Sequence, residues 1–307
     1  MAKSAQPAIV LATSNEPRET ASLRFAADEA QRTGYPLRVV HVVHGTAHEG
    51  RAHPLTYSSG AVEEAGRQVV EQVAERLGVL THGSVPIVTD VFRGRAVDKL
   101  IALSAEAHVV IVQRRGRSRI THPLSPSITE AVAGRSFAPV VSVPPGWDPQ
   151  VEGLDGVALA VGVFARPTHL MLRALESARE HRLPLTVLHA LDFPAVEGTD
   201  SSREQVRRRA AAQAGVDRSM TWLQHHYPDV AVTTEIMIGS PATSVLAAVG
   251  PRQLLVVGRR DAPFPAYEHV GDVTRHLLRT ATVPVVVVPR PSDPAKPRPR
   301  PREHHVS

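Results

Sequence analysis

The 307-residue chain contains no cysteine, which excludes disulfides, thiolate catalysis and thiolate metal sites together. No apolar stretch approaches the roughly 20 residues that a membrane helix requires. The apolar segment within the N-terminal sequence MAKSAQPAIVLATS is too short to read as a secretory signal. These features predict a cytoplasmic protein with no membrane partner.

Three motifs of nucleotide and hydrolase chemistry are also missing from the sequence. There is no Walker A loop, no Gly-x-Ser-x-Gly elbow and no Gly-x-Gly-x-x-Gly fingerprint. Conventional kinase, hydrolase or dinucleotide chemistry is therefore not predicted, although a triad assembled from distant residues stays open.

The excess of positive charge is small and partly confined to the C-terminus. The formal net charge is +5, and the segment 291–307 holds four basic residues, two acidic residues and five prolines. The rest of the chain then carries about +3, which is too little to indicate a nucleic-acid surface. Because the segment has almost nothing apolar, we predict an extended, disordered tail.

The chain is organised as a repeat. Residues 253–289 contain an apolar run, a turn with glycine and arginines, a loop, a helix and a second apolar run, and residues 108–144 repeat this order at an offset of 145. The offset pairs Gly94 with Gly239 and Pro139 with Pro284. Residues 9–41 match residues 157–189 at an offset of 148. Register over such lengths indicates a duplicated domain.

Each repeat alternates short valine-rich runs with helical patterns. In the first repeat we expect strands at 8–13, 37–43, about 85–91, 109–112 and 140–143, and helices at about 17–33, 60–77 and 95–105 and from about 127. Single short crossovers between such strands require a parallel sheet with helices on both faces. The predicted fold is therefore α/β, with two Rossmann-like domains of five parallel strands each.

The domain division follows from the repeat and from a proline- and glycine-rich segment. We predict a first domain at 1–145, a linker at 146–156, a second domain at 157–290 and the tail at 291–307.

Loop spacing in both halves resembles that of the universal stress protein family, in its tandem form, over residues 8–290. The family pattern is an Asp after the first strand and, after the fourth, Gly-x-x-Gly, nine residues and Gly-Ser or Gly-Thr. The second half has Gly258, Asp261 and Gly271-Asp272 at this spacing, and the first half has Gln113, Gly116 and Pro126-Ser127. The resemblance implies the adenine nucleotide alpha hydrolase-like variety of the Rossmann fold.

In the nucleotide-binding branch of the family this loop wraps the phosphates of ATP, and the ends of the first two strands hold ribose and adenine. Glycines allow the backbone N–H groups to approach phosphate, and a neutral hydroxyl at the following helix can donate to it. The resemblance implies ATP or AMP as ligand, and the spacing of the histidines does not indicate a metal site. The candidate residues are Ala12, Thr13, Ser14, Val42, Gln113, Arg114, Gly116 and Ser127 in the first half, and Ala160, Gly258 and Gly271 in the second.

The two halves depart from the pattern in different ways. The position of the family's Asp is Ser14 in the first half and Gly162 in the second. Asp272 is expected to cap its helix and to occupy the terminus that an anion would use. The first half keeps a hydroxyl, Ser127, at that place, so it is the better candidate for a nucleotide site.

Several polar clusters allow a functional and a structural interpretation. The run RRGRSR at 114–119 is either an anion site or a solvated loop, and the arginines at 207–209 are expected on the exposed face of a helix. His41 and His189 are expected as hydrogen-bonded strand residues rather than catalysts. The spacing of His44, His48 and His53 does not fit a helical zinc motif.

The sequence therefore predicts a non-enzymatic stress-response protein that binds a small ligand, with an adenine nucleotide as candidate, or docks to unknown protein partners. A weak nucleotide hydrolase is the alternative, although it would need a carboxylate for a metal ion. Family precedent for pairing through the last strands makes residues 140–143 and 285–288 candidate pairing edges, within one chain as an intramolecular pseudo-dimer or in a homodimer.

Overall fold

A computed structural model describes residues 6–14, 20–43, 59–114, 127–150, 155–162, 169–192, 199–250, 252–259 and 270–290. The remaining residues include Gly116, the other residues of the arginine run after Arg114, and the three histidines His44, His48 and His53; the predictions made for them lie outside the described residues. Among the helices in the described ranges, none is long and apolar enough to cross a membrane.

The first half alternates strands and helices in the predicted order. Its elements are β1 (Ala8–Thr13), α1 (Thr20–Thr33), β2 (Leu37–Val43), α2 (Ser59–Leu80), β3 (Ile87–Arg93), α3 (Ala96–Leu103), β4 (Ala107–Gln113), α4 (Ile128–Arg135) and β5 (Val140–Val143). The third strand therefore begins about two residues later than its pattern predicts. β5 has the predicted bounds.

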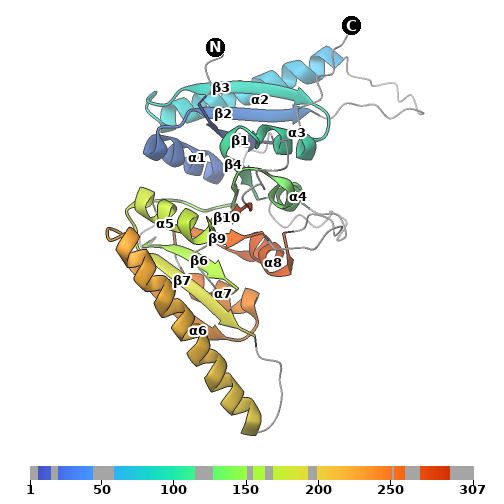
Figure 1. Ribbon diagram of the computed structural model, residues 1–307. Coiled ribbons are helices and arrows are strands. Elements are labelled where there is room, and N and C mark those ends of the chain that lie inside the picture. Colours follow the sequence, from blue (N-terminus) through green and yellow to red (C-terminus); the bar gives the residue numbers. More distant parts are fainter. Residues whose placement is uncertain are drawn as a thin grey trace, which may run out of the picture.

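The second half repeats the order. Its elements are β6 (Val157–Val161), α5 (His169–His181), β7 (Leu185–Leu191), α6 (Thr199–His226), β8 (Val232–Ile238), α7 (Pro241–Val249), β9 (Leu254–Gly258), α8 (Asp272–Thr280) and β10 (Val285–Val288). Arg207, Arg208 and Arg209 are exposed on α6, as expected. One end of this helix extends past the sheet (Figure 1).

The ten strands in the described residues form one sheet, in the order β3-β2-β1-β4-β5-β10-β9-β6-β7-β8. The five strands of each half are parallel to one another, which confirms the predicted fold class. β5 and β10 pair antiparallel and join the halves. Val141 lies opposite Val286, its equivalent in the repeat, so a local two-fold axis passes through this pair.

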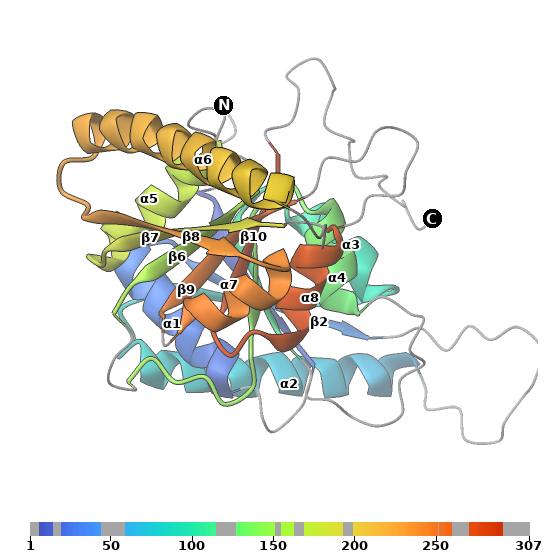
Figure 2. The ribbon, with the colours of Figure 1, turned by 90° about the horizontal axis from the view of Figure 1, so that it is seen from below.

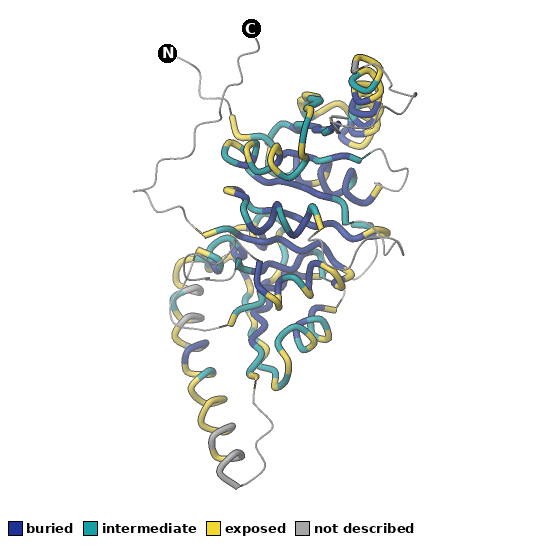
Figure 3. Tube along the Cα trace, turned by 90° about the vertical axis from the view of Figure 1, so that its right-hand side faces the viewer, coloured by how far each residue is buried: buried dark blue, intermediate teal, exposed yellow. Residues whose placement is uncertain are grey.

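Helices cover both faces of the sheet, because the strands bear apolar side chains on both sides. The core on one face contains buried residues of α1, α2 and α5, and the core on the other contains buried residues of α3, α4, α7 and α8. Figure 2 shows α1 and α5 on one side and α4 and α8 on the other. Burial is densest along the central strands (Figure 3), and all four residues of both β5 and β10 are buried.

Trp147 and Asp148, at the start of the predicted linker, lie against the first half, whereas Gly156, at its end, accepts a hydrogen bond from the Gln253 N–H of the second half. Trp147 is 7% exposed, and its ring centroid is 5.4 Å from that of Phe25 in α1. The neighbouring Asp148 forms an ion pair with Arg24 of the same helix. These contacts tie residues beyond β5 to α1, while the division into domains at 146–156 stays a prediction.

Candidate functional site

The predicted site lies where the chain reverses its direction across the sheet. In the first half β1 lies between β2 and β4, and in the second β6 lies between β7 and β9. Ligands of open parallel sheets bind outside the carboxyl ends of the strands at such a switch point. Thr13, Ser14 and Gln113 all lie at this edge of the first half, since β1 and β4 end at Thr13 and Gln113.

The ends of the first two strands are fixed in the same way in both halves. The Nδ1 atom of His41 lies 3.0 Å from the carbonyl oxygen of Thr13, and that of His189 lies 3.0 Å from the carbonyl oxygen of Val161. The prediction of hydrogen-bonded strand histidines is confirmed. Each ring is therefore hydrogen-bonded to the end of the first strand. This contact gives the two histidines a structural role and does not indicate a catalytic one.

Small or apolar candidates line the other face of these strand ends. Ala12, Val42 and Ala160 are partly buried and pack against the core that α3, α4, α7 and α8 cover. Their side chains offer no polar atoms, so any hydrogen bond from these residues to a ligand would come from the backbone.

Gln113, at the position of the family's first glycine, acts on α1. Its Oε1 atom accepts a hydrogen bond of 2.9 Å from the backbone N–H of Ser22, in the first turn of that helix. First-turn N–H groups have no partner within the helix, so the glutamine side chain satisfies one of them. The Nε2 atom of Gln113 is buried without a hydrogen-bond partner. Gln113 therefore links the end of β4 to the start of α1 at the edge of the site.

The second half keeps glycine at this position, and a different neighbour explains it. A Cβ atom added to Gly258 would lie 3.1 Å from Cδ2 of Leu170, in the first turn of α5. Leu170 is the repeat equivalent of Ser22. The strand end therefore meets the helix start in both halves, through a hydrogen bond between Ser22 and Gln113 in the first and through packing of Leu170 on Gly258 in the second.

Ser127 lies at the N-cap of α4. Its Oγ atom accepts a hydrogen bond of 3.1 Å from the backbone N–H of Glu130, and its backbone is extended, with φ −63° and ψ 155°. A hydroxyl that accepts through a lone pair still has its hydrogen to donate. The arrangement presents a neutral donor at the positive end of a helix, which suits an anion.

The corresponding helix start in the second half differs from the expectation. Gly271, with φ 84°, is the N-cap residue of α8, and no side chain caps this helix. Asp272 is the first helical residue, and its Oδ1 atom accepts a 2.9 Å hydrogen bond from Arg275. The prediction that Asp272 caps the helix is wrong, because an ion pair within the first turn satisfies the carboxylate instead.

The guanidinium of Arg114, a candidate ligand contact, lies between the halves. Its Nη1 atom donates to the carbonyl oxygen of Ala281 at 2.6 Å and lies 3.4 Å from that of Leu278, at the end of α8. Burial lowers the pKa of this guanidinium. The side chain of Arg114 thus contacts the second half, and the phosphate contact expected of this residue stays a prediction.

Three residues that carry contacts between the halves are not indicated by the sequence patterns. Arg259, the repeat equivalent of Arg114, donates to the carbonyl oxygens of Gly134 and Ser136 at 3.0 and 3.3 Å. Buried Glu130 accepts hydrogen bonds from Arg279 at 2.7 and 3.2 Å. The offset of 145 pairs Arg114 with Arg259, and this signal could have found Arg259. No such signal marks Glu130 or Arg279.

A first strand flanked by the second and fourth, repeated and joined through the last strands, defines a tandem Rossmann-like α/β protein. The chain belongs to the universal stress protein family, whose family model matches residues 7–144 and 160–289. Universal stress protein Rv1996 of Mycobacterium tuberculosis is 28% identical over 94% of this chain and 97% of that relative. A universal stress protein of Mycolicibacterium smegmatis is 27% identical over 91% and 96%.

Solved structures agree with the fold. The crystal structure of a universal stress protein from Archaeoglobus fulgidus DSM 4304 superposes with a TM-score of 0.64 at 18% identity, covering 92% of this chain and 96% of that one. At this identity the likeness shows the fold alone.

Proposed function

We propose that this tandem universal stress protein binds an adenine nucleotide, ATP or AMP, at the C-terminal edge of the first half and thereby regulates a protein partner in a stress response. The observation that carries the proposal is the start of α4, where the neutral hydroxyl of Ser127 caps the helix and keeps a hydrogen to donate. Phosphate oxygens are favoured at such a terminus. The remaining proposed contacts are the strand ends at Ala12, Thr13, Ser14 and Val42.

The second half is the weaker candidate. Asp272 places a carboxylate that is 81% exposed at the start of α8, where its charge opposes a phosphate group. Glu130, the carboxylate in the first turn of α4, is instead buried and paired with Arg279. Leu170 also packs on Gly258 at the edge where the loop begins. We propose that Ala160, Gly258 and Gly271 retain the family geometry without a nucleotide.

We propose that the protein binds the nucleotide without hydrolysing it. The family's Asp position is Ser14 in the first half and Gly162 in the second, so both halves lack the carboxylate that could hold a metal ion at this position. The expected output is therefore a ligand-dependent change in partner binding.

The test is calorimetric titration of the full chain with ATP and with AMP, with and without magnesium. Ser127→Asp retains a capping side chain but adds a negative charge, so binding should weaken by at least about tenfold. Ser127→Asn, which is neutral and also caps helices well, should stay within about threefold of the parent. Asp272→Asn, the matched change in the second half, should leave the binding unchanged.

Two outcomes contradict the proposal. If the folded protein releases no heat with either nucleotide, the stress-response role rests on partner docking alone. If Ser127→Asp binds as the parent does, any nucleotide site lies elsewhere. Phosphate release that Ser127→Asp abolishes would instead support the hydrolase.

A further inference from the structure

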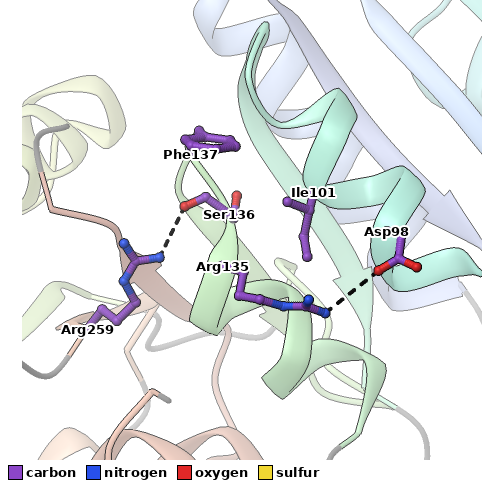
Figure 4. Close-up of a pocket in the computed structure, with 6 residues that line it drawn as sticks. All are labelled: Asp98, Ile101, Arg135, Ser136, Phe137 and Arg259. Carbon is purple, nitrogen blue, oxygen red and sulfur yellow. Dashed lines mark hydrogen bonds and ion pairs between the residues drawn. The ribbon is translucent and has the colours of Figure 1, made fainter. Parts of the chain in front are cut away.

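A cleft of about 340 Å³ lies between the halves, away from Ser127. Its lining residues come from α3, from the end of α4 and the turn after it, and from the residue that follows β9: Asp98, Ile101, Arg135, Ser136, Phe137 and Arg259 (Figure 4). Ser127 caps one end of α4 and Arg135 ends the other, so this eight-residue helix, about 12 Å long, separates the cleft from the proposed nucleotide site.

Two guanidinium groups give the cleft a positive side. Arg259 is held in place by the carbonyl oxygens of Gly134 and Ser136. Arg135 is held only loosely: its Nη2 atom lies 4.0 Å from Asp98, and its Nε atom lies 3.5 Å from the carbonyl oxygen of Ala131. A planar guanidinium with such long contacts suits a carboxylate, which accepts two parallel hydrogen bonds.

An aromatic ring forms the apolar side. Phe137 is 42% exposed, although phenylalanine is usually buried. The turn that carries it is fixed, because the Phe137 N–H donates to Ser104 Oγ at 3.0 Å and Ser136 Oγ donates to the carbonyl oxygen of Ala138 at 2.6 Å. Figure 4 shows the ring near Ser136, with Ile101 of α3 between it and Asp98. The exposed ring is therefore preorganised for a flat apolar group.

The equivalent place across the local two-fold axis lacks these features. At the offset of 145, Asp98 and Ile101 become Thr243 and Leu246, while Arg135 and Phe137 become Thr280 and Thr282. Arg114, which corresponds to Arg259, makes the same kind of contact with helix-end carbonyls. Contact between the halves thus uses an arginine at the position of Arg259 in both repeats. Arg135, Asp98 and Phe137 have no counterpart of the same kind in the second repeat, so pairing of the halves does not explain them.

We propose that this cleft binds a small aromatic carboxylate. Its carboxylate pairs with Arg135 in the field of Arg259, in place of the long contact to Asp98, and its ring packs on Phe137 and Ile101. The proposal is independent of the nucleotide proposed for the first half.

The probe is 4-hydroxybenzoate, titrated into the full chain by calorimetry, with the neutral 4-hydroxybenzyl alcohol as matched ligand. Saturable binding is expected for the acid, with a Kd below about 10 mM, and binding of the alcohol should be weaker by at least about tenfold. Arg135→Gln should weaken binding of the acid by about tenfold, and Phe137→Ala should weaken it by about fivefold. Thr282→Ala, the change at the equivalent position of the other half, should have no effect.

Both cleft variants change exposed or half-exposed side chains, so folding can be confirmed by circular dichroism before titration. Ser127→Asp should bind the probe as the parent does. The proposal is overturned if the acid does not saturate, if Arg135→Gln keeps the parental affinity, or if Ser127→Asp abolishes binding, which would place the probe in the nucleotide site.

Discussion

Arg114 and Arg259 occupy equivalent positions in the two repeats, and each holds the end of the last helix of the opposite half. Arg114 donates to the carbonyl oxygens of Leu278 and Ala281 beside α8, and Arg259 to those of Gly134 and Ser136 beside α4. The last carbonyls of a helix lack intrahelical partners and carry partial negative charge, which a cation offsets. The halves therefore cap each other across the β5–β10 pair.

Removing one of these reciprocal caps should destabilise the whole chain. Arg114→Gln loses charge-assisted hydrogen bonds to two carbonyl oxygens, so the free energy of unfolding should fall by about 1.5–3 kcal/mol. Arg114→Lys keeps the charge but lacks the planar guanidinium, so its free energy of unfolding should lie between those of Arg114→Gln and the parent. The measurement is urea denaturation. The exposed Arg203 on α6 supplies the control Arg203→Gln, expected within about 0.5 kcal/mol of the parent. Equal losses in both variants would show that the caps do not stabilise the interface.

Two ion pairs across the local axis join equivalent positions that bear opposite charges. Arg275 Nε lies 3.8 Å from Glu130 Oε2, and Arg32 Nη1 lies 3.6 Å from Glu180 Oε2. Position 130 corresponds to 275 at the offset of 145, and 32 corresponds to 180 at the offset of 148. Two identical halves would place like charges together at these points. The charges therefore favour pairing of the first half with the second over pairing of like halves.

The Glu130–Arg279 contact also joins the two halves, and its interaction energy can be measured directly. The Glu130 side chain is 5% exposed, and Arg279 binds it through two nitrogens. A double-mutant cycle with Glu130→Gln and Arg279→Gln should give an interaction energy of about 0.5–3 kcal/mol. The exposed pair Glu64–Arg67 is the matched control, and its cycle should give at most about 1 kcal/mol. A Glu130–Arg279 value no larger than that of the control would contradict a role in pairing.

The repeat and the valine-rich runs are sufficient to predict the ten strands, because buried parallel strands require apolar side chains on both faces. The side-chain contacts of the site are not predictable in the same way. The loop pattern marks Gln113 only as a lost glycine, yet its role depends on Ser22, which lies 91 residues earlier in the chain. The same pattern marks Arg114 as part of a charged loop, yet its partner lies 167 residues later. Such contacts depend on how α1 and α8 approach the strand ends, and local sequence does not encode that geometry.

Acid should lower the stability of the chain through a half-buried histidine, His181, at the end of α5. Burial is the main cause that lowers the pKa of His181, whose Nδ1 atom lies 2.7 Å from the carbonyl oxygen of Ser177. Arg32 and Arg173 also lower this pKa, whereas Glu29 and the hydrogen bond to Ser177 oppose the shift. In the unfolded chain this histidine takes up a proton near pH 6.5, whereas the folded state resists protonation to lower pH. Stability should therefore fall as the pH drops from about 6.5 toward the lowered pKa.

His181→Gln should flatten the slope of unfolding free energy between about pH 7 and pH 5, measured by urea denaturation at fixed ionic strength. Glu180→Gln is the control of opposite sign. Burial raises the pKa of Glu180, so the folded state binds its proton more readily than the unfolded state. That contribution is present at low pH and is lost as the pH rises through the raised pKa. An unchanged slope in His181→Gln would show that the histidine does not govern the acid response.

The last prediction concerns two equivalent residue pairs, Gln113 with Ser22 in the first half and Gly258 with Leu170 in the second. Gln113→Gly removes the acceptor for the Ser22 N–H, so the free energy of unfolding should fall by about 0.5–2 kcal/mol, as for the loss of a helix cap. The same change restores glycine at the start of the loop and lets the backbone approach phosphate. Nucleotide affinity should rise while stability falls.

The reciprocal change tests the interpretation in the second half. In Gly258→Gln the new Cβ atom would lie only 3.1 Å from Cδ2 of Leu170, and the rest of the side chain enters the same space, so overpacking should cost about 1–3 kcal/mol. Adding Leu170→Ser recreates the pair of the first half, and the double variant should recover stability relative to Gly258→Gln. Denaturation of the three chains measures this. If the second change recovers nothing, the two halves do not use the same contact, and Gln113 is a substitution that α1 does not require.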